Sequence, residues 1–394
     1  MTSSDWTGGT EAALPIDRYA GSLAGRVFNP AVEGPSVVAF REDGVFDLSA
    51  TFATMRELFE EADPAASLAA AEGDSLGSFA DVLANTVPET RDDSKPYLLS
   101  PIDLQVVKAA GVTFAVSMLE RVIEERARGD VEAAASIREN IMREIGGEFS
   151  IIRPGSAEAI KLKALLIEQG LWSQYLEVGI GPDAEIFTKA PILATVGTAT
   201  EVGVLSTSNW NNPEPEVVLA VASDGRIVGA SLGNDVNLRD VEGRSALLLP
   251  KAKDNNASGS LGPFIRFFDA GFSLDDVRAT TVTLQIEGDD GFTLHATSHL
   301  DQISRDPADL VAQLMGEHHQ YPDGVVLYLG TMFAPVVDRA EPGQGFTHHV
   351  GDVVRISAPL LGTLVNHVQF SERCAPWQFG VAALMANLAE RNLL

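Results

Sequence analysis

The chain has 394 residues, a formal net charge of −27, 45% hydrophobic and 21% charged residues, and one cysteine. This composition is typical of a packed globular protein. The length fits two domains, or one large domain with an appendage. The negative charge excludes nucleic-acid partners, because Lys and Arg must supply the phosphate contacts of such binding, and a lone cysteine excludes an intrachain disulfide. No stretch has the pattern of a signal peptide or the length of a membrane span, so we expect a cytoplasmic protein with no membrane partner.

The first hundred residues predict a small N-terminal domain. Residues 1–20 have the composition of a flexible arm, and apolar runs on either side of Glu42-Asp43-Gly44 predict a hairpin. A helical pattern around Leu58 and Phe59 follows. The polar stretch that ends at Pro96 marks a boundary, so we predict an N-terminal domain over 1–97 and a second domain over 98–394.

The second domain begins with predicted helices and continues as a β-rich region. Apolar residues recur at helical spacing over 101–128, and another helix is predicted over 158–169. Beyond Glu177, short apolar segments separated by Gly, Asp-Gly and Pro turns predict strands, with a short helix over 307–317. The predicted fold class is therefore α+β.

Three carboxylates converge at the open end of one predicted hairpin. Asp224-Gly225 between two apolar runs predicts a two-residue turn, which places Glu216 opposite Gly233 and Glu214 opposite Asp235. Residues two apart in a strand share a face, so all three acidic side chains point to the same side. Close carboxylates cannot all stay ionised without compensation, so we expect a cation among them, and an all-oxygen ligand set suits Mg²⁺ or Mn²⁺.

A solvated strand edge is the alternative interpretation of these acids. The apolar run Val217–Ala222 argues against it, because it predicts a strand buried on both faces. Lys251 or Lys253 in the following loop would, taken alone, be a surface residue. Near a divalent site, such a lysine is better placed to bind a carboxylate or to act as a base.

Several spaced motifs resemble the fumarylacetoacetate hydrolase family, and the resemblance extends over roughly 98–394. The motifs are Pro-Glu214-Pro-Glu216, Gly-Asn-Asp235-x-x-x-Arg239-Asp240, Lys253 followed by Leu261-Gly-Pro263, Leu329-Gly330-Thr331, Val350-Gly-Asp-Val-Val354 and Leu361-Gly-Thr-Leu364-Val-Asn366. The resemblance implies the family's mixed β-roll catalytic domain, preceded by a smaller N-terminal α/β domain. It also implies that Glu214, Glu216 and Asp235 hold Mg²⁺.

The resemblance assigns further roles by motif position. The expected proton-transfer residues are Lys253 as first candidate with Glu185 and Glu120 as alternatives, and the expected substrate-binding residues are Arg239, Thr331 and Ser258. The family's lysine maps to Lys253 by its spacing to Leu-Gly-Pro. For Arg239, an ion pair with Asp240 or Glu242 is an equally good interpretation.

One departure from the family pattern selects a branch. Hydrolases of this family show Gly-x-Asn-Tyr-x-x-His-x-x-Glu in a lid segment, whereas this chain has Ser117 at the histidine position and keeps Glu120. Without that base, water attack on a carbonyl has no proton acceptor. The segments Glu185-Ile-Phe-Thr-Lys189 and Ser100-Pro-Ile-Asp103 look like those of the 2-keto-3-deoxy-pentonate dehydratase branch.

The resemblance therefore implies an Mg²⁺-dependent hydro-lyase of oxidative pentose catabolism. Its substrate would be a small 2-keto-3-deoxy sugar acid derived from D-xylonate or D-arabinonate, and its product 2,5-dioxopentanoate (alpha-ketoglutarate semialdehyde). The alternative is an Mg²⁺-dependent C–C hydrolase or decarboxylase of acylpyruvate-type or oxaloacetate-type 2-oxo acids. We expect a homo-oligomer, as is usual for such enzymes.

Overall fold

The computed structural model describes residues 8–128, 130, 137, 153–168, 172–331, 333, 337–339 and 345–394. Across this part of the chain, no helix combines the length and the apolar character needed to cross a membrane. The first seven residues of the predicted arm lie outside the described residues. The remainder of that segment includes helix α1 (Gly9–Ala13), whose last residue is buried.

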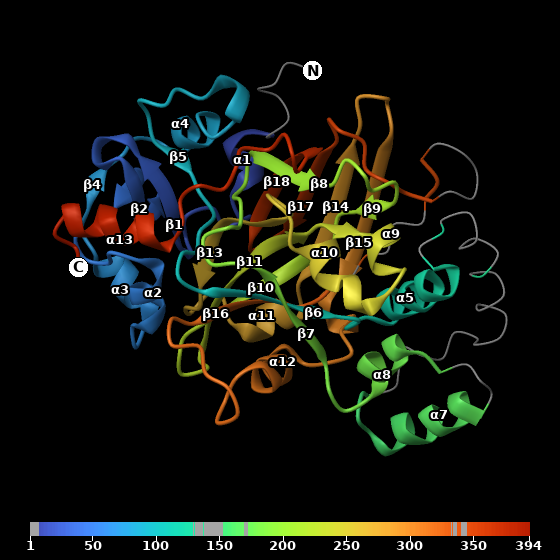
Figure 1. Ribbon diagram of the computed structural model, residues 1–394. Helices are drawn as coiled ribbons and strands as arrows, with labels where there is room; N and C mark the ends of the chain where they lie inside the picture. Colours follow the sequence, from blue (N-terminus) through green and yellow to red (C-terminus); the bar gives the residue numbers. More distant parts are fainter. Residues whose placement is uncertain are drawn as a thin grey trace.

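A large mixed sheet runs through the molecule (Figure 1). Within the described residues, its strands in order of pairing are β4 (Asp74–Ser75), β3 (Gly44–Asp47), β2 (Gly34–Arg41), β1 (Ser22–Asn29), β13 (Gly259–Phe267), β11 (Ile227–Asp235), β10 (Pro215–Val221), β16 (Val325–Tyr328), β6 (Val106–Gly111) and β7 (Glu185–Ala190), and β5 (Tyr97–Leu98) also pairs with β1. Because β1 pairs with β13, strands from both predicted domains belong to one sheet. The domain boundary near residue 97 stays a prediction.

A second sheet packs against the first and completes the α+β fold. Its strands, again among the described residues, are β15 (Thr293–His299), β14 (Thr281–Glu287), β17 (Val353–Ala358), β18 (Gly362–Phe370) and β8 (Thr200–Val204), and a separate short ladder joins β12 (Asn237–Leu238) to β9 (Asn211–Asn212). Alternate residues of β10, such as Leu219, share a core with Leu284 of β14. The intervening residues, such as Val218, lie in a core with Phe59 on the opposite side. Strand β10 is therefore buried on both faces, as predicted.

Helices cover the two ends of the large sheet. In Figure 1, α2, α3 and α13 lie beside β1 and β2, whereas α5, α7 and α8 lie at the opposite end. The α-helices are α2 (Met55–Glu60), α3 (Pro64–Ala70), α4 (Phe79–Ala84), α5 (Ala115–Ala127), α7 (Ala157–Glu168), α8 (Gln174–Ile180), α9 (Arg239–Glu242), α10 (Leu249–Lys253), α11 (Leu274–Arg278), α12 (Pro307–Leu314) and α13 (Val381–Glu390), and the 3-10 helices are η1 (Pro30–Val32), η2 (Pro88–Thr90), η4 (Ala246–Leu248) and η5 (Leu300–Gln302).

Local sequence signals explain several of these boundaries. The predicted helix at 307–317 begins with a proline in its first turn, and Asp306 caps it by accepting a hydrogen bond from the backbone N–H of Ala308. The helix predicted over 158–169 is α7, and the end of that prediction at Gln169 lies outside the described residues. The predicted hairpin around Glu42-Asp43-Gly44 joins β2 to β3.

The helix predicted over 101–128 is wrong in its first half. Residues Val106–Gly111 form strand β6, and helix α5 begins only at Ala115. Strand β6 lies between β16 and β7, and Lys108 is its only charged residue, so the segment shows no regular alternation of apolar and polar residues. A short apolar run of this kind has no clear period, and here tertiary pairing decides between strand and helix.

Candidate metal centre

The hairpin formed by β10 and β11 brings the three predicted acidic residues together. Glu216 pairs with Gly233 in the ladder, and the backbone N–H of Asp235 donates to the carbonyl of Glu214 at 3.0 Å. The three side chains offer ligand atoms that all lie within 4.8 Å of one another. Their exposed fractions are only 3%, 1% and 1% in the order Glu214, Glu216, Asp235. The predicted geometry of this trio is confirmed.

The turn of this hairpin differs from the prediction. The backbone N–H of Ala222 donates to the carbonyl of Arg226, so the loop has three residues, Ser223 to Gly225, instead of two. A bulge beyond Val221 then shifts the pairing by one residue, because Val221 pairs with Ile227 but Ala220 pairs with Gly229. The longer loop and the bulge cancel, so the acids still meet in the predicted register.

Hydrogen-bond donors and a cation hold the acids in place. Lys253 Nζ forms ion pairs with Glu214 and, at 3.0 Å, with Asp235 Oδ2. The backbone N–H of Gly330 donates to Glu216 Oε2 at 2.7 Å. Lys253 is 2% exposed, so these interactions act in a region from which water is largely excluded.

Burial and mutual repulsion set the pKa values of this group. Burial and the charges of Asp235 and Glu214 raise the pKa of Glu216 well above its ordinary value. Burial also disfavours the charged form of Asp235, but the ammonium groups of Lys189 and Lys253 hold its pKa below the ordinary value. Burial disfavours the Lys253 ammonium, but the charges of Asp235 and Glu214 outweigh that effect and raise its pKa. Glu216 is therefore the member of the trio with least compensating charge.

A small cavity of about 10 Å³ opens between the acids and the surrounding strands, and this volume is near the minimum for one water-sized ligand. Its lining includes the trio together with Lys253, Glu185, Thr331, Arg121, Glu242, Phe187 and the backbone segment Ala110, Gly111 and Val112.

Glu185 begins β7, and burial raises the pKa of its carboxyl. Thr331 is 8% exposed, and its hydroxyl donates to the carbonyl of Phe333 at 3.1 Å.

Two of the predicted side chains form an ion pair with each other and do not line the cavity. Arg239 donates to Glu120 Oε2 at 3.1 Å and stacks over the ring of Trp210, with 4.7 Å to its centroid. Arg239 is thus paired with Glu120, a partner that the sequence analysis did not consider, and its predicted ion pair with Asp240 or Glu242 stays a prediction. The side chain of Ser117, at the histidine position of the family's hydrolases, lies outside the described part of the chain.

Ser258 is also outside the cavity lining. Its hydroxyl donates to the backbone carbonyls of Lys253 and Asn255, at 2.7 and 2.9 Å, and accepts from the backbone N–H of Asn255 at 3.0 Å. These contacts close the loop between α10 and β13 on itself. The hydroxyl therefore shapes the loop that carries Lys253.

Sequence reasoning missed two cationic residues of this region, Arg121 and Lys189. Arg121 forms ion pairs with Glu214 and, at 2.8 Å, with Glu242. Lys189 has no exposed surface, and its Nζ lies 2.8 Å from Asp235 Oδ1. Each of them comes from an element far away in the chain, so no local spacing indicates these contacts. The sequence offers one hint to their role in the site, because each lies in or directly beside a motif that the sequence analysis had already named. Arg121 follows Glu120, and Lys189 ends the segment Glu185-Ile-Phe-Thr-Lys189.

The arrangement fits a hard divalent cation. Five carboxylates (Glu214, Glu216, Asp235, Glu185 and Glu242) face three cationic side chains (Lys253, Arg121 and Lys189). The trio supplies only oxygen ligands, which suit Mg²⁺ and Mn²⁺, and the raised pKa of Glu216 reports uncompensated negative charge where such an ion would bind. Glu214, Glu216 and Asp235 are the residues able to hold it.

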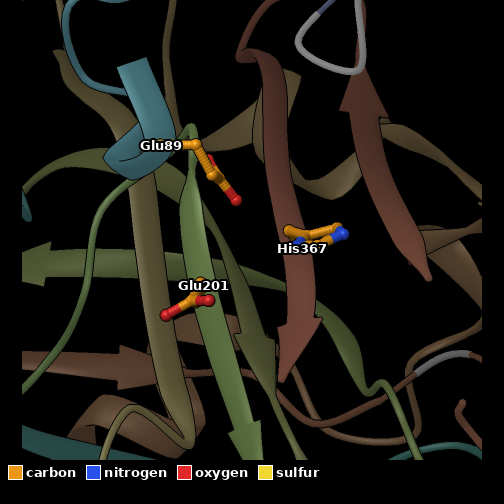
Figure 2. Close-up of side chains that lie close together, drawn as sticks. All are labelled: Glu89, Glu201 and His367. Carbon is orange, nitrogen blue, oxygen red and sulfur yellow. The ribbon is translucent and has the colours of Figure 1, made fainter. Parts of the chain in front are cut away.

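A second group of potential metal ligands lies elsewhere in the fold. Glu89 of η2, Glu201 of β8 and His367 of β18 also have ligand atoms within 4.8 Å of one another (Figure 2). Glu201 and His367 are paired on neighbouring parallel strands. Glu89 is exposed and the other two are half-buried. The sequence analysis did not single out any of these three residues.

Comparison with known proteins places the trio in a family. Residues 211–369, which contain all three acids, match the family described as Fumarylacetoacetate (FAA) hydrolase C-terminal. This segment of the chain is therefore similar to the fumarylacetoacetate hydrolase family. The fold agrees, because the chain superposes with a TM-score of 0.61 on a structure described as 2-keto-3-deoxy-D-arabinonate dehydratase complexed with magnesium and 2,5-dioxopentanoate. That comparison has 20% sequence identity and covers 88% of this chain and 99% of the other.

Two curated proteins are similar to this chain in sequence. The "Probable 2-keto-3-deoxyxylonate dehydratase" of Haloferax volcanii is 26% identical over 332 residues, which cover 84% of this chain and 94% of that protein. The "2-dehydro-3-deoxy-D-arabinonate dehydratase" of Saccharolobus solfataricus is 29% identical over 185 residues, 47% of this chain and 58% of that protein. Both relatives are named as dehydratases of 2-keto-3-deoxy-pentonates.

Proposed function

We propose that this protein is an Mg²⁺-dependent hydro-lyase that converts a 2-keto-3-deoxy-pentonate, derived from D-xylonate or D-arabinonate, to 2,5-dioxopentanoate and water. The observation that carries the proposal is the buried trio Glu214, Glu216 and Asp235, which faces a cavity lined by further ionisable groups. The names of the two relatives and the magnesium and product in the similar structure support the same reaction. Cytoplasmic location and a homo-oligomeric state are part of this proposal.

The reaction needs a proton to leave C3 and the C4 hydroxyl to leave as water, after which the unsaturated product isomerises to the dioxo acid. A bound Mg²⁺ supplies Lewis-acid stabilisation of negative charge on the 2-keto oxygen and carboxylate end of the substrate. Glu214, Glu216 and Asp235 would hold it. No atoms are gained or lost apart from one water, so no further reactant is required.

Two cavity-lining groups are suited to the proton transfers. Burial raises the pKa of Glu185, which moves this carboxyl toward neutral pH and makes it a better base for the C3 proton. Lys253 presents an ammonium to the same cavity and is placed to donate a proton to the departing C4 hydroxyl. Glu120, the other residue expected from the sequence, is paired with Arg239 outside the cavity lining, so we assign it no transfer.

The remaining side chains orient the substrate and keep the site polar. Thr331 lines the cavity, and we assign it a contact with a substrate oxygen. Arg121 brings a second cation to the lining and is a better candidate for a substrate carboxylate than Arg239, which stacks on Trp210. In this proposal, Ser258 acts on the substrate only through the loop that positions Lys253.

The decisive experiment mixes the purified protein with each 2-keto-3-deoxy-pentonate, with and without Mg²⁺, and identifies the products by mass spectrometry. We expect Mg²⁺-dependent formation of 2,5-dioxopentanoate with loss of one water. Release of pyruvate or CO₂ from acylpyruvates or oxaloacetate, without any dehydration, would favour the C–C hydrolase or decarboxylase alternative. Full turnover after exhaustive chelation would remove the metal role.

A further inference from the structure

Lys189, which the proposed reaction does not use, forms the most completely enclosed charged contact near the trio. It lies on β7, and its ammonium has no exposed surface. Nζ lies 2.8 Å from Asp235 Oδ1 and donates to the carbonyl of Val236 at 3.2 Å and to the carbonyl of Lys253. The hydroxyl of Ser258 lies 3.4 Å away.

These contacts join three segments that build the metal centre. Asp235 and Val236 are at the end of β11, Lys253 is the last residue of α10, and Ser258 precedes β13. One ammonium therefore ties the strand that presents a carboxylate of the trio to the helix end that presents Lys253. Because a buried charge that loses a partner is costly, each of these segments is restrained by the same group.

Lys189 and Lys253 contact different oxygens of Asp235. Lys189 Nζ lies 2.8 Å from Oδ1, whereas Lys253 Nζ donates to Oδ2 at 3.0 Å. The stem of Lys189 has little freedom to move, since a β-carbon built on Gly259 would meet its Cε at 3.3 Å. The carboxylate is therefore restrained by an ammonium group beside each of its oxygens.

We infer that Lys189 is a positioning residue that orients Asp235 and the end of α10 in the arrangement that would hold Mg²⁺. The inference rests on the proposed metal role of Asp235. Groups that hydrogen-bond metal ligands from outside commonly change metal affinity by roughly 10–100-fold when they are replaced. Lys189 does not touch the reacting atoms in this assignment.

The test compares Lys189→Met with wild-type protein by isothermal titration of Mg²⁺ and by the Mg²⁺ dependence of turnover. We expect Mg²⁺ affinity to fall roughly 10–100-fold, while turnover at saturating Mg²⁺ falls much less. Lys108→Met is the matched control, because Lys108 lies on the neighbouring strand β6 and its Nζ contacts Thr188 instead of the trio. Leu58→Ala, in the core beside α2, controls for a loss of stability alone.

Each outcome separates this inference from the proposed function. If wild-type protein binds no Mg²⁺, the proposed function fails. If wild-type protein binds Mg²⁺ and Lys189→Met binds it equally well, only the positioning role is overturned. If Lys189→Met does not fold, Lys189→Arg replaces it in the test. Arginine keeps the positive charge, but its larger head group cannot reproduce the contact of Lys189 with Asp235 in the narrow space beside Gly259. That variant is then expected to fold and to bind Mg²⁺ at least about fivefold more weakly, and unchanged affinity would overturn the inference.

Discussion

Two groups of side chains in this protein bring potential metal ligands equally close together, yet their surroundings differ. In both groups the ligand atoms lie within 4.8 Å of one another. Glu214, Glu216 and Asp235 are almost completely buried, whereas Glu89 is exposed. Proximity alone therefore does not distinguish a metal centre. Burial does, because solvent screens exposed charges but leaves buried ones to be compensated by the protein or by an ion.

The first and largest expected difference between the two groups is in turnover. Glu216→Gln removes a charged ligand of the proposed metal and should lower turnover roughly 1,000-fold, since Lewis-acid stabilisation is worth several kcal/mol. Glu201→Gln makes the same change in the second group and should leave turnover within about twofold of wild type. Steady-state assays of both variants, with folding checked by circular dichroism, test this. Equal losses in the two variants would mean that the second group also serves catalysis.

Mg²⁺ should stabilise the protein through the buried group only. At a free concentration of 100 times its Kd, a ligand that binds only the folded state adds about 2.7 kcal/mol, which corresponds to a rise in Tm of a few degrees. We expect this rise in wild-type protein and in Glu89→Gln/Glu201→Gln, but not in Glu214→Gln/Glu216→Gln. Thermal unfolding with and without Mg²⁺ measures it. A rise that persists without the buried carboxylates would place the ion elsewhere.

The cations of the buried group are a third point of contrast. Arg121→Met leaves Glu214 and Glu242 without their shared partner, and breaking a buried pair in this way costs about 3–5 kcal/mol. Turnover should fall about 10–100-fold, because the orientation of Glu214 is lost. Arg126→Met, at an exposed position of the same helix, is the control and should change neither quantity. Chemical denaturation and steady-state kinetics together measure both effects.

The buried acids could be predicted because their signal is local. Glu214 and Glu216 share a face by their spacing, and the turn near Asp224 brings Asp235 opposite them. The exact turn was not predictable, since the loop has one residue more than expected and the bulge beyond Val221 compensates for it. The error in the turn does not change the predicted site, because the pairing of β10 with β11 at the three acids depends only on the sum of the loop length and the bulge.

Arg121, Lys189 and the second group could not be predicted, for the opposite reason. Arg121 and Glu214 are 93 positions apart and meet only because α5 packs over the end of the sheet. Likewise, Glu201 and His367 become neighbours through the parallel pairing of β8 with β18. No spacing in the sequence reports such contacts. The strand at 106–111 was missed on similar grounds, because its neighbours β16 and β7 come from distant segments.

The smallest expected effect concerns Cys374, which reports on the second group. Burial, together with the negative charge of Glu201, raises the pKa of the Cys374 thiol to about 12. At pH 8 only about one thiol in 10,000 is therefore ionised, and the thiolate is the reactive form. Thiol reagents should label the unfolded protein quickly and the native protein very slowly, which a spectrophotometric thiol assay measures.

Substitutions in the two groups should then act differently on this labelling. Glu201→Gln removes a charge that disfavours the thiolate, so the pKa of Cys374 should fall and native labelling should become faster, by less than about tenfold because burial is the larger cause. Glu216→Gln, the variant with the large loss of turnover in the first prediction, should leave the labelling rate unchanged. A faster rate in Glu216→Gln would show that the two groups are coupled through the fold, and their separation into one buried metal centre and one independent surface group would have to be abandoned.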